Sequence, residues 1–109
     1  MPTLNRDIII EHSIKSILSQ TNSNWRLVIF DNGSTDKTKI LCEKYTYDNR
    51  IKYVRSEKTL DVHNSWEKSI SYVKSDYFVV FSDDDIMKKN FIAEVSKHSE
   101  KKKYENEPI

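Results

Sequence analysis

Residues 25–36 read WRLVIFDNGSTD, an apolar run followed directly by residues typical of turns. The first six residues are apolar, β-branched or aromatic apart from one arginine, which predicts a buried strand. Asp31-Asn32-Gly33 has tight-turn chemistry, because glycine takes positive φ without strain. Ser34 or Thr35 can cap a following helix. A strand that ends in a polar turn before a helix is the repeating unit of an α/β fold.

Helical and strand patterns alternate along the rest of the chain. Apolar residues at three- and four-residue spacing predict helices over residues 5–20, 36–45 and 62–74 and from residue 91, with Asn5 capping the first. The alternating run at 51–55 predicts a strand near a sheet edge, and DYFVVFS at 76–82 predicts the most buried strand of the chain. This order predicts a three-layer α/β fold whose mostly parallel sheet is flanked by helices.

Length and composition restrict the possible functions. The 109 residues allow one domain, predicted at residues 1–96, with a charged tail over 97–109 that lacks an apolar face. The net charge of +1 argues against nucleic-acid binding, which shows as a basic excess. Cys42 is the only cysteine, which excludes an internal disulfide and predicts a packed thiol. No apolar run predicts a transmembrane helix and no signal peptide is evident, so we expect a cytoplasmic protein.

Three adjacent carboxylates follow the predicted strand at 76–82. Asp83, Asp84 and Asp85 repel one another, and a divalent cation such as Mg²⁺ or Mn²⁺ would remove that conflict. The alternative is a capped turn, in which Ser82 or Asp83 caps the last helix. In a parallel sheet, this cluster and the Asp31 turn are predicted to share the edge where ligands bind. Histidines on separate segments and the absence of a glycine-rich loop exclude the common zinc and phosphate-loop motifs.

Five segments, in order and spacing, resemble family 2 glycosyltransferases of the GT-A fold, specifically their nucleotide-binding half. They are PTLNR (2–6), SILSQT (16–21), FDNGSTD (30–36), HNSW (63–66) and FSDDD (81–85). The resemblance implies a metal-dependent enzyme that transfers sugar from a nucleotide-diphospho-sugar, a UDP-type donor, with inversion. The acceptor would be a glycan or a lipid-linked sugar in polysaccharide or surface-glycan synthesis, with peripheral membrane association as an added possibility.

The same resemblance implies the site residues. The nucleotide would be bound by Pro2, Thr3, Arg6, Asp31, Asn32 and Asp83, and the metal by Asp84 and Asp85. Within that set the resemblance implies that Thr3 and Arg6 lie by the base, that Asp31 hydrogen-bonds it, and that Asp83 approaches the ribose. The metal would act as a Lewis acid on the leaving diphosphate.

The chain also departs from the family pattern. Only Met1 precedes the PTLNR segment where family members have an apolar strand, so we expect a truncated sheet that lacks its first strand. The acceptor-binding half and its general base are expected to be absent from this chain. Asn32 replaces a frequent aspartate, and Asp61 stands where glycine is common. The alternatives are therefore a catalytically inactive remnant or interaction module, and a phospho-receiver-like domain, which the position of the triple acid fits poorly.

Overall fold

The computed structural model describes the backbone of residues 1–105 and the side chains of residues 1–98. The elements are β1 (Pro2–Thr3), α1 (Ile10–Leu18), β2 (Leu27–Asp31), α2 (Thr38–Glu43), β3 (Ile51–Arg55), α3 (Val62–Ile70) and α4 (Phe91–Glu105). The predicted strand at 51–55 is confirmed to the residue. Helices α1, α2 and α3 are shorter than the sequence patterns predicted.

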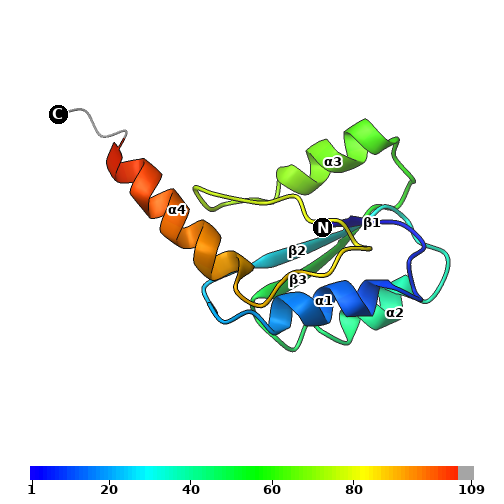
Figure 1. Ribbon diagram of the computed structural model, residues 1–109. Coiled ribbons are helices and arrows are strands. Elements are labelled where there is room, and N and C mark those ends of the chain that lie inside the picture. The colour runs from blue at the N-terminus through cyan, green and yellow to red at the C-terminus, as the bar shows by residue number, and fades with distance from the viewer. Residues whose placement is uncertain (106–109) are drawn as a thin grey trace.

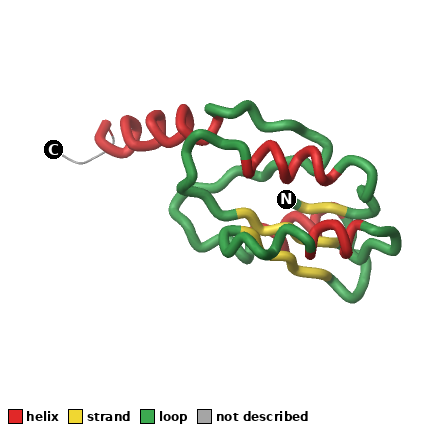
Figure 2. The backbone as a smooth tube through the Cα atoms, turned by 90° about the horizontal axis from the view of Figure 1, so that it is seen from below, coloured by secondary structure: helices red, strands yellow, loops and turns green. Residues whose placement is uncertain are grey.

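The sheet is parallel, with its strands in the order β1-β2-β3. Its register pairs Pro2 with Phe30 and Leu27 with Ile51. Helices α1 and α2 cover one face and α3 covers the other, so the sheet lies between two helical layers (Figures 1 and 2). The three-layer α/β fold is confirmed, and β3 lies at the sheet edge as its alternating pattern predicted.

The core lies between the sheet and α1. Ile10, Ile14 and Ile17 recur at helical spacing on α1 and are buried against Ile29 of β2. Cys42 of α2 is fully buried in the same cluster, and burial raises the pKa of its thiol to about 12. The packed thiol is therefore confirmed, and at neutral pH it stays protonated.

The prediction that residues 76–82 form the most buried strand of the chain is wrong. Within residues 1–105 this segment belongs to no strand, and Tyr77, Phe78 and Val79 are each more than half exposed. β2 already pairs with β1 and β3 on its two sides. A further strand could pair with only the two residues of β1, and one of them, Pro2, has no N–H to donate. Although this segment is apolar and has a high β-propensity, it therefore has no neighbouring strand with which to form a hydrogen-bonded ladder.

The strand that the sequence analysis expected to be lacking is present as two residues. Phe30 N donates to the Met1 carbonyl, and Asn32 N donates to the Thr3 carbonyl, both at 2.9 Å. The first residues of the chain thus occupy the position beside β2. This placement puts the residues that follow Thr3 at the carboxyl end of the sheet.

α4 projects from the body of the fold (Figure 1). It runs from Phe91 to Glu105, and the expectation of a charged, frayed tail from residue 97 stays a prediction. Residues 106–109 lie outside the described residues, and the domain boundary at 96 stays a prediction. Among the residues that the structure describes, no helix is both long and apolar enough to cross a bilayer.

Candidate functional site

A buried carboxylate stands at the end of the central strand. Asp31, the last residue of β2, is fully buried. Its Oδ1 accepts from Ser34 N at 2.8 Å and its Oδ2 accepts from the Tyr53 hydroxyl at 2.5 Å. Burial, together with the hydrogen bond to Asp31, raises the pKa of Tyr53. The phenol therefore remains a donor, and β3 fixes the orientation of the Asp31 side chain.

Asn5 ties the start of the chain to the same turn. Its Oδ1 accepts from Thr35 N at 2.8 Å, and its backbone N donates to Ser34 Oγ at 2.9 Å. Asn5 has φ 52°, in the left-handed region that asparagine tolerates better than most residues. The prediction that Asn5 caps the first helix is wrong, because α1 begins after Ile9 and the Asn5 side chain satisfies backbone N–H groups of the turn instead.

Asn32 holds a second loop against the turn. Its carboxamide donates to the Leu60 carbonyl at 2.9 Å and accepts from Leu60 N at 2.8 Å. Gly33, at φ 90°, lies so close to this loop that a Cβ would come within 3.1 Å of Thr59 Oγ1. The polar atoms of the Asn32 side chain are thus engaged by backbone. Its contact with a nucleotide stays a prediction, and its evident role is to position the loop at 56–60.

Two residues far apart in the sequence meet beyond the carboxyl end of β1. Arg6 Nε lies 3.7 Å from Asp83 Oδ2, across 77 residues of sequence, with the Arg6 side chain half exposed and Asp83 nearly buried. Thr3 is 4% exposed, and its hydroxyl has no hydrogen-bond partner within the described part of the chain. Pro2 pairs with Phe30 and so alternates to the opposite face of the sheet. The structure therefore brings Arg6 and Asp83 together at the end of the sheet where Thr3 pairs with Asp31, while Pro2 contributes to the strand.

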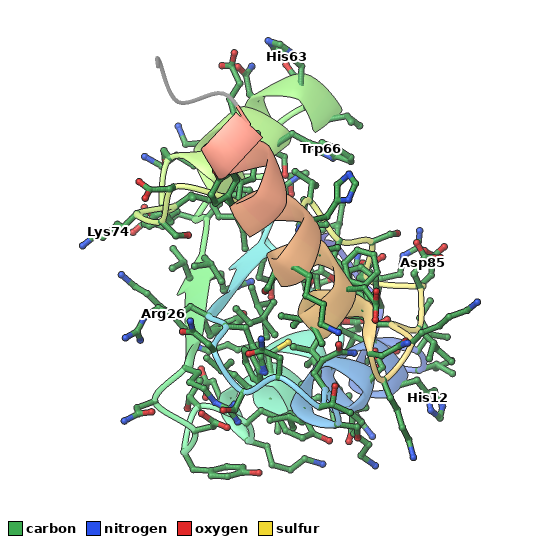
Figure 3. The ribbon with its side chains drawn as sticks, turned by 60° about the vertical axis from the view of Figure 1, so that its left-hand side comes forward. His12, Arg26, His63, Trp66, Lys74 and Asp85 are labelled. Carbon is green, nitrogen blue, oxygen red and sulfur yellow. The ribbon has the colours of Figure 1, made fainter. Side chains whose placement is uncertain are left out.

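The other two acidic residues point to solvent. Asp84 and Asp85 are exposed, and Asp84 Oδ1 accepts from Ser82 Oγ at 2.5 Å. Figure 3 shows Asp85 on the loop that passes beside α1. No group of three potential metal-ligating side chains is found among the described residues. Oxygen ligands from one or two carboxylates, completed by phosphate and water, nevertheless suit Mg²⁺ chemistry. Metal binding by Asp84 and Asp85 stays a prediction.

Several residues of this site were missed by sequence reasoning. Tyr53 was assigned only to a strand pattern, although a tyrosine on the strand next to a buried aspartate is a signal that could have been used. The bonds of Asn32 to Leu60 had no signal, because they depend on where a loop of irregular structure returns. His12 and His63 lie apart in Figure 3, as expected for histidines that share no site.

The sequence model described as Glycosyl transferase family 2 matches residues 1–106. The chain belongs to this family. Its motifs at the carboxyl ends of β1 and β2 are thus those of a glycosyltransferase domain, as the resemblance implied.

Curated relatives and solved structures agree with this assignment. The chain is 29% identical over 93 residues to the glycosyltransferase GlyG of Streptococcus pneumoniae, which covers 84% of this chain and 31% of GlyG. It is 30% identical over 86 residues to WfgD of Escherichia coli, a UDP-Glc:alpha-D-GlcNAc-diphosphoundecaprenol beta-1,3-glucosyltransferase, covering 79% and 34%. The crystal structure of S. aureus TarS 1–349 in complex with UDP has a TM-score of 0.85 at 19% identity, covering 92% and 30%. This likeness shows the shared fold. The chain spans about a third of the length of each of these two curated relatives.

Proposed function

We propose that this family 2 glycosyltransferase domain binds the UDP part of a nucleotide-sugar at the carboxyl ends of β1 and β2. The observation that carries the proposal is the Arg6–Asp83 ion pair at the end of the sheet where Thr3 pairs with the buried Asp31. Ligands of open α/β sheets bind at the carboxyl ends of the strands. The name of WfgD gives UDP-glucose as its donor, and the TarS structure contains bound UDP.

Each of these residues offers chemistry that a nucleoside diphosphate needs. The Arg6 guanidinium always carries a positive charge, which offsets the charge of a diphosphate. The Asp83 carboxylate can accept from ribose hydroxyls, and the buried Thr3 hydroxyl can donate to or accept from a base edge. Asp31 keeps lone pairs beyond the two bonds it accepts, so its contact with the base remains part of the proposal.

We propose that Asp84 and Asp85 hold a divalent cation, Mg²⁺ or Mn²⁺, together with the diphosphate. When bound, such a cation supplies Lewis-acid stabilisation of the leaving diphosphate. Asp84 is already oriented by Ser82, while both carboxylates stay open to solvent and to a ligand. In the absence of a glycine-rich loop, these carboxylates and Arg6 are the charged groups of the chain that would organise the phosphates.

The acceptor side belongs to the proposal as well. Transfer with inversion to a glycan or lipid-linked acceptor needs a general base, which we do not assign to a residue of this chain. WfgD acts, by its name, on a sugar linked to diphosphoundecaprenol. That supports a lipid-linked acceptor, and with it a cytoplasmic protein that associates peripherally with a membrane.

Calorimetric titration with UDP in Mn²⁺ and then in EDTA tests the proposal. We expect binding that requires the metal and is weakened at least about tenfold by Asp84→Asn, because one of its few ligands changes charge. Asp76→Asn is the matched control, since Asp76 is an exposed aspartate outside the acidic cluster. Equal affinity for UDP in Mn²⁺ and EDTA would refute the metal. A folded chain that binds no UDP would favour the inactive remnant or interaction module.

A further inference from the structure

One face of α1 carries three buried polar side chains. Ser13, Ser16 and Gln20 follow one another at spacings of three and four residues, and none is more than 9% exposed. Helical geometry places such residues on a single stripe. A buried polar side chain needs a hydrogen-bond partner, so the stripe must be matched by polar groups of whatever packs against it.

The partner is the irregular segment that contains the acidic cluster. Ser13 Oγ lies 2.8 Å from the Asp83 carbonyl and 2.5 Å from the Asp85 carbonyl, and donates to this pair. Further along the stripe, Ser16 Oγ accepts from Met87 N at 2.9 Å. At its end, Gln20 donates through Nε2 to the Lys88 carbonyl at 2.7 Å and accepts through Oε1 from Ile92 N at 3.1 Å.

These bonds replace a β-ladder. Within the described residues, the backbone between α3 and α4 joins no strand, so its N–H and C=O groups must find other partners. Ser13 turns two carbonyls of the acidic cluster toward the helix. With both carbonyls held, the Asp83 side chain faces inward to Arg6, while Asp84 and Asp85 face solvent.

We propose that Ser13, assisted by Ser16 and Gln20, is a positioning residue that fixes the direction of the carboxylates in the acidic cluster. The inference rests on the proposed function, because it assigns to α1 the orientation of the groups that hold the metal and the diphosphate. Ser16 and Gln20 belong to the segment SILSQT at 16–21, and Ser13 lies one helical turn before it. The side chain at position 13 must be small, because Ser13 is 1% exposed and is packed between α1 and the loop.

Apolar packing alone does not account for this orientation. Met87 is buried in the core cluster, and Phe81 and Ile92 pack against it. Such contacts fix where the segment lies, but they are non-directional and do not fix which way a carbonyl points. The hydrogen bonds from α1 are directional, and they are made to the residues of the acidic cluster themselves.

The test compares Ser13→Ala with Ser19→Ala. Ser19 is the C-cap of α1, but its exposed hydroxyl bonds, within the described part of the chain, only the Lys15 carbonyl of its own helix. The quantity measured is the ratio of UDP affinity in Mn²⁺ to that in EDTA. Ser13→Ala is expected to lower this ratio about tenfold, in the range of residues that orient metal ligands. Ser19→Ala is expected to leave it unchanged. A merely structural loss would weaken UDP in both buffers equally and keep the ratio.

A folded Ser13→Ala variant that keeps the wild-type ratio would overturn the proposal. If Ser13→Ala does not fold, Ser16→Ala and Gln20→Met take its place, and failure of all three to fold beside a folded Ser19→Ala would also overturn it. Backbone amide spectra separate this failure from that of the proposed function. Shifts at Asp84 and Asp85 in Ser13→Ala, without shifts in Ser19→Ala, are expected whether or not the wild type binds UDP. Their absence refutes the positioning role, whereas a wild type that binds no UDP refutes the proposed function.

Discussion

Replacing Tyr53 by phenylalanine removes a single oxygen atom from the site. That hydroxyl donates to Oδ2 of Asp31, a fully buried residue whose other oxygen, Oδ1, accepts from Ser34 N. The loss of a hydrogen bond to a buried charged group costs about 2 kcal/mol. For a domain of this length the variant should therefore unfold about 8–16 °C below the wild type. The ring itself remains, so the packing of β3 should be unchanged.

The same bond gives the stability a pH dependence above neutrality. The pKa of Tyr53 is raised in the folded chain, so the unfolded state loses the phenolic proton first, near pH 10. Unfolding then releases a proton, and the free energy of unfolding falls as the pH rises above 10, by about 1.4 kcal/mol per pH unit for one such group. Tyr45, whose pKa is raised to about 12 mainly by burial, adds a second contribution of the same sign between pH 10 and 12.

Urea unfolding followed by circular dichroism, at pH 8 and at intervals up to pH 11, measures both effects. Tyr53→Phe should be less stable at pH 8 and should lose stability less steeply above pH 10, by the contribution of one proton. Tyr47→Phe is the matched control, because Tyr47 is 77% exposed and should behave as the wild type. A Tyr53→Phe variant as stable at pH 8 as Tyr47→Phe would refute the view that the phenol supports the buried carboxylate.

Two further outcomes follow from the backbone. Gly33→Ala should destabilise the chain by about 1–2 kcal/mol in urea unfolding, because a residue with a side chain is strained at φ 90° and the new Cβ would crowd Thr59. A variant as stable as the wild type would contradict that backbone conformation. Amide hydrogen exchange should be fast over residues 77–82 and slow in β2, because the first segment joins no ladder in the described structure and β2 pairs on both sides; equal protection would show that 77–82 forms a strand in solution.

Local patterns were sufficient for the elements whose partners lie nearby. Two patterns indicate which face of an element is buried: the alternation at 51–55 and the helical spacing of Ile10, Ile14 and Ile17. In both cases the burial of that face determines which secondary structure forms. The run at 76–82 is at least as apolar, yet its strand depends on a neighbour with free N–H and C=O groups. β1 provides two residues, one of them proline. Composition predicts the tendency to form a strand but cannot supply the edge that a strand requires.

The same distinction applies to the site. The motifs identified Thr3, Arg6, Asp31 and Asp83 as residues of one region, and the structure brings them to one end of the sheet. Apart from Tyr53, their supports could not be predicted, because they are side chains that bond backbone far away in sequence, such as Asn32 to Leu60. Such bonds need a small polar side chain at one position and leave the sequence of the other segment unconstrained. No pattern in the second segment therefore records them.

This construction has a consequence for how the site can change. Asn5, Asn32 and Ser13 each hold an irregular segment through side-chain bonds to backbone, in place of a ladder. Because a ladder bond is made by backbone alone, it survives most substitutions, whereas each of these bonds disappears with one residue. Each bond contributes about 1 kcal/mol, a small part of the roughly 5–15 kcal/mol that is typical of a folded domain. Substitutions at these positions should therefore alter the orientation of the loops around the site before they alter the fold.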